Sequence, residues 1–152
     1  GLSRNKYCIG VGCNDDTVVC FVEGKAKTSS IKTLKFFKDH IKLNSVLKHD
    51  GEKSHNMLIK ELNLKEEFYK ATTPNKVKDE DNPLRKVNHH CANIRDFLDA
   101  HPGFNRNELQ DYLNLYSFKY NTKGTNLEKV EKILELSLNS NKTITFREYY
   151  SK

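Results

Sequence analysis

The order of apolar segments along the chain constrains its fold more than any single motif does. Residues 7–23 are typical of a β-hairpin, because two stretches rich in β-branched and aromatic residues flank the turn-forming Asn14, Asp15 and Asp16. Further on, helical patterns at 28–41 and 54–62 alternate with strand patterns at 45–51 and 67–71. Such alternation favours parallel pairing, and the hairpin adds an antiparallel part. We therefore expect an α/β fold in which helices flank one mixed sheet.

The second half of the chain is expected to be helical after a polar loop over 72–81. One helix is predicted to begin at Asn82 and Pro83, a second after Asn105, and a third at the capping box formed by Thr125 and Glu128. Residues 143–150 alternate like a strand, but an irregular packed tail is also compatible with them. We predict two domains, a core over 1–100 and a C-terminal helical extension over 101–152 that packs on it.

The chain is basic, with a net charge of +6 and 26 Lys and Arg residues distributed along its 152 positions. This charge favours a polyanionic partner such as DNA or RNA. A basic solvated surface that binds no nucleic acid is the alternative interpretation. No run approaches the ~18 apolar residues of a membrane span, and the first residues lack a signal peptide's apolar core. We expect a soluble cytoplasmic protein without a membrane partner.

The four cysteines do not form a recognisable zinc motif. Cys8, Cys13, Cys20 and Cys91 include no CxxC pair and no histidine at a matching spacing, which argues against a zinc ribbon. Three of them lie in or beside strand-like stretches, and we expect reduced, buried thiols.

Two polar residues occupy positions that suit a metal-dependent nuclease. Asp50 ends a short strand, and Asn88 lies one turn into the helix that follows Pro83. Arg95 comes seven positions after Asn88, so the two share a helix face at about 3.6 residues per turn. Two-metal phosphoryl transfer needs oxygen ligands around two Mg²⁺ ions, and a nearby arginine can contact a DNA phosphate. His89 is expected to contact solvent or phosphate, because adjacent helical histidines point in different directions.

Several stretches in order resemble one family, the bacterial insertion-sequence transposases of the DDE type, and more narrowly the group whose catalytic triad reads Asp-Asp-Asn. The stretches are DGEKSHN at 50–56, VNHHC at 87–91 and NRNELQDYLN at 105–114, preceded by GLSRNKYC at 1–8, which is similar to the segment after that group's first catalytic strand. The resemblance implies an RNase H-like fold truncated at its first strand and extended by C-terminal helices. It also implies DNA, both transposon ends and target, as partner, and a homo-oligomer in the full-length enzyme.

Residue by residue, the resemblance assigns Asp50 to the second triad position, Asn88 to the third, and Arg95 to a DNA-contacting position. No residue of the chain matches the first triad Asp or the family's N-terminal zinc ribbon. The cofactor that the family implies is Mg²⁺, or Mn²⁺, and it is expected only in a complete site. With Asp50 as the one remaining carboxylate, we expect the 152 residues alone to be catalytically inactive.

Two other interpretations stay open on the sequence. One is a non-catalytic nucleic-acid-binding domain with an RNase H-like shape and a basic surface. The other is a small helical interaction protein in which Asp50 and Asn88 are incidental, since Asp-Gly at a strand end is an ordinary turn former.

Overall fold

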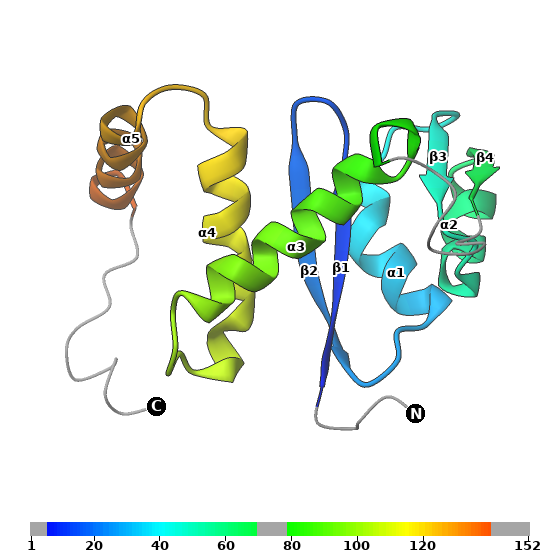
Figure 1. Cartoon of the computed structure of the whole chain (residues 1–152), viewed down its shortest axis with the longest axis horizontal. Coiled ribbons are helices and arrows are strands. Elements are labelled where there is room, and N and C mark those ends of the chain that lie inside the picture. The colour runs from blue at the N-terminus through cyan, green and yellow to red at the C-terminus, as the bar shows by residue number, and fades with distance from the viewer. Residues whose placement is uncertain (1–5, 70–78, 141–152) are drawn as a thin grey trace. The chain divides into compact units, whose positions relative to one another are not determined.

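The computed structural model describes residues 6–69 and 79–140. The chain separates into two compact units, residues 1–121 and residues 122–152. Strands, helices and 3-10 turns alternate through the first unit, and the second contains one described helix (Figure 1). The protein is therefore of the mixed α/β class. No helix among the described residues is long and apolar enough to cross a membrane.

The hairpin predicted at the start of the chain is confirmed. Strand β1 (Tyr7–Cys13) pairs antiparallel with β2 (Val18–Lys25), with Val11 opposite Cys20. The turn between them is held by Asn14, whose side-chain oxygen accepts hydrogen bonds from the backbone N–H groups of Asp16 and Thr17 at 2.9 and 2.8 Å. This is the local bonding that makes asparagine favourable in turns.

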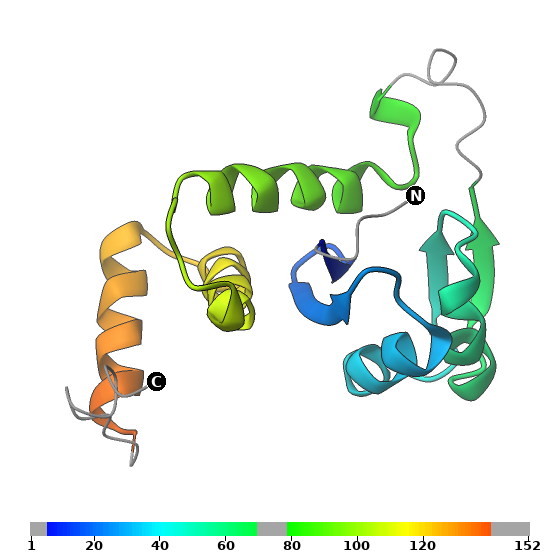
Figure 2. The same ribbon diagram turned by 90° about the horizontal axis from the view of Figure 1, so that it is seen from below.

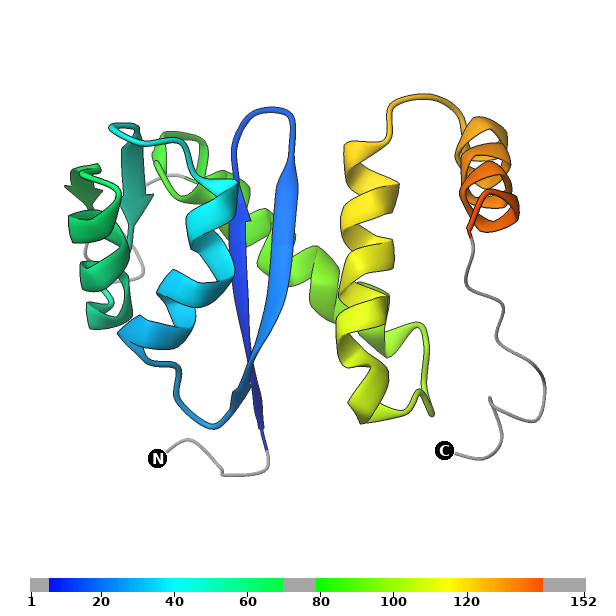
Figure 3. The same ribbon diagram turned by 180° about the vertical axis from the view of Figure 1, so that it is seen from behind.

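Both faces of the hairpin are covered, because successive side chains of a strand point to opposite sides. On one face, Val18 and Cys20 pack against helices α3 (Arg85–Asp99) and α4 (Leu109–Asn121). On the other, Val19 and Phe21 pack against a cluster built around Phe37 of helix α1 (Ser30–Phe37). Figures 1 and 3 show α1 and α3 on opposite sides of the two strands.

Two glycines of β1 make room for α1. A Cβ atom on Gly10 would lie 2.8 Å from the Phe37 ring, and one on Gly12 would lie 3.1 Å from the same ring. The phenylalanine therefore rests directly on the strand backbone, where no side chain could intervene. Phe37 is only 6% exposed, although the helix that carries it is two turns long.

A second, smaller sheet follows. Strand β3 (Val46–His49) pairs in parallel with β4 (Lys65–Phe68), and the connection between them contains the 3-10 turn η2 (Lys53–His55) and helix α2 (Asn56–Glu61). Figure 2 shows the two arrows pointing the same way. The described strands thus form two separate two-stranded sheets, whereas the sequence predicts one mixed sheet. Periodicity identifies strands, but it does not specify which strands become neighbours.

The outer edge of β2 is covered by amide side chains of α4. Asn121 accepts a hydrogen bond from the Val18 N–H at 2.7 Å and donates one to the Val18 carbonyl at 2.9 Å. Gln110 accepts from the Val22 N–H at 2.9 Å and donates to the Cys20 carbonyl at 3.0 Å. These four bonds replace the bonds that a further strand would make, so this edge cannot extend the sheet.

The helices of the second half begin close to the predicted positions. Helix α3 starts at Arg85, whereas the sequence predicts Asn82 as N-cap and Pro83 as the first helical residue. The Asn82 side chain accepts a hydrogen bond from the Leu84 N–H at 2.9 Å in the turn that leads into the helix. The capping box at Thr125 is confirmed at the start of α5 (Asn126–Leu138). Residues 143–150, with their predicted strand or tail, lie outside the described residues.

The division into units comes after Asn121, whereas the predicted domain boundary is at residue 100. The reason is that Leu109, Leu113 and Tyr116 of α4 share one buried cluster with Val18 and Cys20 of the hairpin. Helix α4 is therefore part of the first unit's core, although its sequence pattern resembles that of an added helix.

Candidate functional site

The carboxyl end of β3 carries the most concentrated group of metal-binding side chains in the described part of the chain. His49, the last residue of β3, is 5% exposed, and Asp50 follows it in an exposed position. The backbone then turns at Gly51, whose φ of +82° lies in the left-handed region that favours glycine. Asp50 stabilises this turn by accepting a hydrogen bond from the Glu52 N–H at 3.1 Å. The turn leads into η2 and brings His55 back beside the strand end.

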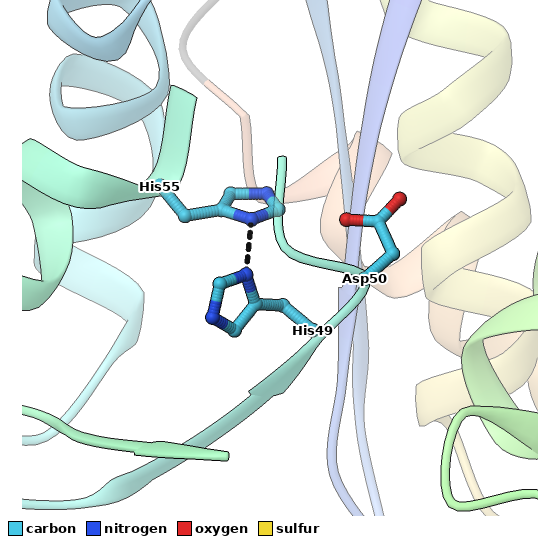
Figure 4. A group of neighbouring side chains, drawn as sticks. All are labelled: His49, Asp50 and His55. Carbon is cyan, nitrogen blue, oxygen red and sulfur yellow. Dashed lines mark hydrogen bonds between the residues drawn. The ribbon is translucent and has the colours of Figure 1, made fainter. Parts of the chain in front are cut away.

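Three side chains meet there, as Figure 4 shows. The Nδ1 atoms of His49 and His55 are 3.0 Å apart. One ligand atom from each of His49, Asp50 and His55 lies within 4.8 Å of the other two. Two imidazole nitrogens and a carboxylate oxygen can ligate a divalent metal ion.

Glu66 of β4 fixes the orientation of His49. The His49 Nε2 atom lies 3.0 Å from a carboxylate oxygen of Glu66. The backbone N–H of Gly51 points at the other ring nitrogen, Nδ1, at 3.2 Å. Because an N–H can donate only to a lone pair, Nδ1 is the unprotonated nitrogen and Nε2 donates its proton to Glu66. The parallel pairing of β3 and β4 thus sets the tautomer of this histidine.

His55 favours its neutral form. Burial lowers the pKa of the His55 imidazole below its ordinary value, and His49 lowers this pKa further, while the Asp50 carboxylate opposes both. Neutral imidazole is the form that binds metal ions. Two neutral imidazoles therefore meet at the end of β3, where the Nδ1–H of His55 donates to the Nδ1 lone pair of His49.

The structure places the residues predicted from the sequence on two elements. Asp50 belongs to the group just described. Asn88, His89 and Arg95 lie on exposed positions of α3, a helix that packs on β1 and α4. His89 contacts the side chain of Asn93 one turn later, with its Nε2 2.9 Å from Nδ2.

Among the residues that the structure describes, no hydrogen bond or ion pair joins Asp50 to any of the three α3 residues. The structure thus brings Asp50 together with two histidines that the sequence analysis did not single out as ligands. The shared role of Asp50 and Asn88 stays a prediction.

The missed residues left a recognisable signal in the sequence. His49 immediately precedes Asp50, and His55 follows after a glycine-containing turn, giving the pattern His-Asp-Gly-x-x-x-His. A tight turn after a strand reverses the chain, so residues on the two sides of the turn lie close to the same strand end. Two histidines on either side of such a turn are therefore candidates for a shared ligand.

The comparisons with known proteins do not extend this picture. No protein-family model, no curated protein and no solved structure matches the chain.

Proposed function

We propose that these 152 residues are the C-terminal part of a DDE-type transposase of the Asp-Asp-Asn group, with an RNase H-like catalytic domain that acts on DNA. One observation carries the proposal: Asp50 follows the carboxyl end of β3 in a parallel pair whose strands are connected through a helix. In α/β sheets, functional groups gather at the carboxyl ends of strands. The choice of family comes from the sequence stretches around Asp50 and Asn88, which resemble that group.

The free edge of the hairpin supports an RNase H-like arrangement. Val18, Cys20 and Val22 present backbone groups to α4, so the β1 residues opposite them, Cys13, Val11 and Ile9, present theirs to the other edge. In the described part of the chain, β1 pairs with β2 alone. A further strand could pair with the free edge of β1 but not with β2, as an RNase H-like fold with one more strand requires.

Mg²⁺ does not fit the groups now seen around Asp50. This ion demands oxygen ligands in near-octahedral geometry, and the described neighbours of Asp50 are two imidazoles. Asn88 would add a neutral oxygen but no charge. We therefore derive no metal-dependent step for the 152 residues by themselves, and we propose that they bind DNA without cutting it.

DNA binding is tested by titrating duplex DNA at two salt concentrations. The distributed basic residues should give sequence-independent binding that weakens steeply with salt. Arg95→Ala should weaken binding of all sequences and reduce the salt slope by about 1. Arg106→Ala, which removes an exposed arginine from the turn before α4, is the matched control and should change less. Absent binding, or tight binding unaffected by salt, would contradict the proposal.

Cleavage separates a transposase from a non-catalytic DNA-binding domain. The 152 residues should show no strand cleavage or joining with Mg²⁺ or Mn²⁺. A longer chain that adds an N-terminal strand carrying an Asp should show both. In that longer chain, Asp50→Ala should abolish cleavage, Asn88→Ala should impair it, and Asn88→Asp should preserve it because an oxygen stays in place. An inactive longer chain that still binds DNA would favour the non-catalytic alternative.

A further inference from the structure

We propose that His49, Asp50 and His55 bind a divalent cation of the zinc class, through the Nδ1 atoms of both histidines and one carboxylate oxygen of Asp50. The proposal is independent of the transposase assignment, because it concerns nitrogen ligands that Mg²⁺ avoids and zinc prefers. It assigns a binding site and no reaction.

The spacing of the two nitrogens fits one ion. Zinc–nitrogen bonds are about 2.0–2.1 Å long, so two nitrogens bound to one ion at angles of about 90–110° lie about 2.9–3.4 Å apart. The observed separation of the Nδ1 atoms is 3.0 Å. The carboxylate of Asp50 lies within 4.8 Å of both, which a small rotation of an exposed side chain can shorten.

Glu66 supplies the support that metal-binding histidines usually have. Such a histidine typically donates its second ring N–H to a carboxylate, which orients the ring and makes the ligating nitrogen more basic. The Nε2 atom of His49 makes this bond to Glu66 at 3.0 Å, leaving Nδ1 toward His55. His49 is 5% exposed, so its ring is also held by packing.

The ligands come from a short, defined piece of backbone. His49 is the last residue of β3 and His55 the last residue of η2, and the glycine turn between them is stabilised by Asp50. Three protein ligands leave one tetrahedral position for water, as in open zinc sites. Asp50 is exposed, so an ion can reach the site from solvent.

Binding requires two small local changes. The Gly51 N–H, 3.2 Å from Nδ1 of His49, must give up that lone pair to the ion. The proton that lies between the two Nδ1 atoms in the ion-free contact must move to the Nε2 atom of His55, because both Nδ1 lone pairs then bind the metal while each ring stays neutral. This change of tautomer releases no net proton, but binding should weaken as the pH falls because protons compete with the metal for the two imidazoles.

The experiment measures binding of Zn²⁺ to the chelator-treated 152-residue chain by titration calorimetry, with Mg²⁺ as the comparison ion. We expect one Zn²⁺ per chain and no comparable heat with Mg²⁺. Asp50→Asn and His55→Ala should each reduce affinity by about 100-fold or more, and Glu66→Gln by about 10–100-fold. His101→Ala, which removes an exposed histidine elsewhere in the chain, should leave affinity unchanged. Circular dichroism checks that each variant is folded.

The four free cysteines require a second readout, because thiolates also bind zinc. Substituting Co²⁺ for Zn²⁺ gives visible absorption from a nitrogen and oxygen site, without the near-ultraviolet sulfur-to-cobalt band. A sulfur band would overturn the proposal. So would a Zn²⁺ affinity that is unchanged in Asp50→Asn and His55→Ala, or a titration in which the chain does not bind one Zn²⁺ ion. None of these readouts involves DNA, so failure here is distinguishable from failure of the proposed function.

Discussion

The two sheets differ in how completely the rest of the chain covers them. The hairpin β1–β2 is packed on both faces, and side chains of α4 hydrogen-bond to its outer edge. The parallel pair β3–β4 has four residues in each strand, and only one face of β3 turns inward, with Leu47 half-buried and His49 buried. On its other face, Val46 is 50% exposed. Phe68, the β4 residue paired with His49, is 56% exposed.

The two sheets also differ in what they carry: the hairpin belongs to the stable core, and the parallel pair carries the candidate ligands. The candidate ligands His49, Asp50 and His55 all lie at the end of the sparsely covered pair. Loops at strand ends can carry polar side chains, because a rigid neighbouring core supplies the stability that these groups do not. The hairpin is that core.

The largest expected effect comes from a truncation beneath the hairpin. Leu113 of α4 is fully buried in the cluster that holds Val18, and Leu113→Ala should lower the free energy of unfolding by about 3–5 kcal/mol through lost burial and a cavity. Leu47→Ala is the matched change at a half-buried position of β3, and it should lower the free energy of unfolding by about half as much. Urea unfolding of both variants measures this. Equal losses would remove the distinction between the two sheets.

The edge bonds are the next test. Asn121→Ala removes both hydrogen bonds to the Val18 backbone and should destabilise the protein by about 1–3 kcal/mol, because the N–H and carbonyl lose their partners in a half-buried setting. Asn107→Ala, at an exposed position in the turn before α4, serves as control. Hydrogen exchange of the Val18 amide should accelerate in Asn121→Ala only. If it does not, the amide bonds do not protect this edge.

Local chemistry made part of the fold predictable from sequence. The turn residues between β1 and β2 and the capping box at Thr125 act within a few residues of their own positions, and both are found as expected. The candidate Asp50 likewise follows its strand, because the strand pattern and the Asp-Gly turn lie side by side in the sequence.

Long-range pairing was not predictable in this way. Gln110 and Asn121 look like surface residues of a helix, yet they bond to strand residues 88 and 103 positions away. No periodic pattern encodes such a contact, so the sequence predicts neither the two separate sheets nor the inclusion of α4 in the first unit. The Nδ1 contact of His49 and His55 depends on how tightly one turn closes, which composition alone does not give.

A fall in pH should lower the free energy of unfolding by a smaller amount, through one histidine beside each sheet. Burial lowers the pKa of His90, which contacts Tyr116 beneath the hairpin at 2.8 Å, and burial also lowers the pKa of His55 at the end of β3. Each folded histidine resists a proton that the unfolded chain accepts below a pKa of about 6.5. Stability is therefore fully present above that pH and falls as the pH drops below it.

Unfolding by urea at about pH 7.5 and about pH 5.5, with chelator present, measures this loss. His90→Gln and His55→Gln should each flatten the pH dependence, because each removes one group that protonates more readily in the unfolded chain. A variant whose pH dependence equals that of the parent would show that its histidine is not held neutral by the fold.

The smallest effect is expected on the exposed face of β3. Val46→Thr replaces a methyl group by a hydroxyl of similar size at a position that is 50% exposed, and both residues are β-branched, so strand propensity is kept. The new hydroxyl can bond to water, and the free energy of unfolding should change by less than about 0.5 kcal/mol. Val18→Thr makes the same change at a position that is 0% exposed in the hairpin. There the hydroxyl enters an apolar cluster, and the cost should be about 1–3 kcal/mol. A Val46→Thr loss as large as that of Val18→Thr would mean that the outer face of β3 is covered in solution, and that the parallel pair is as enclosed as the hairpin.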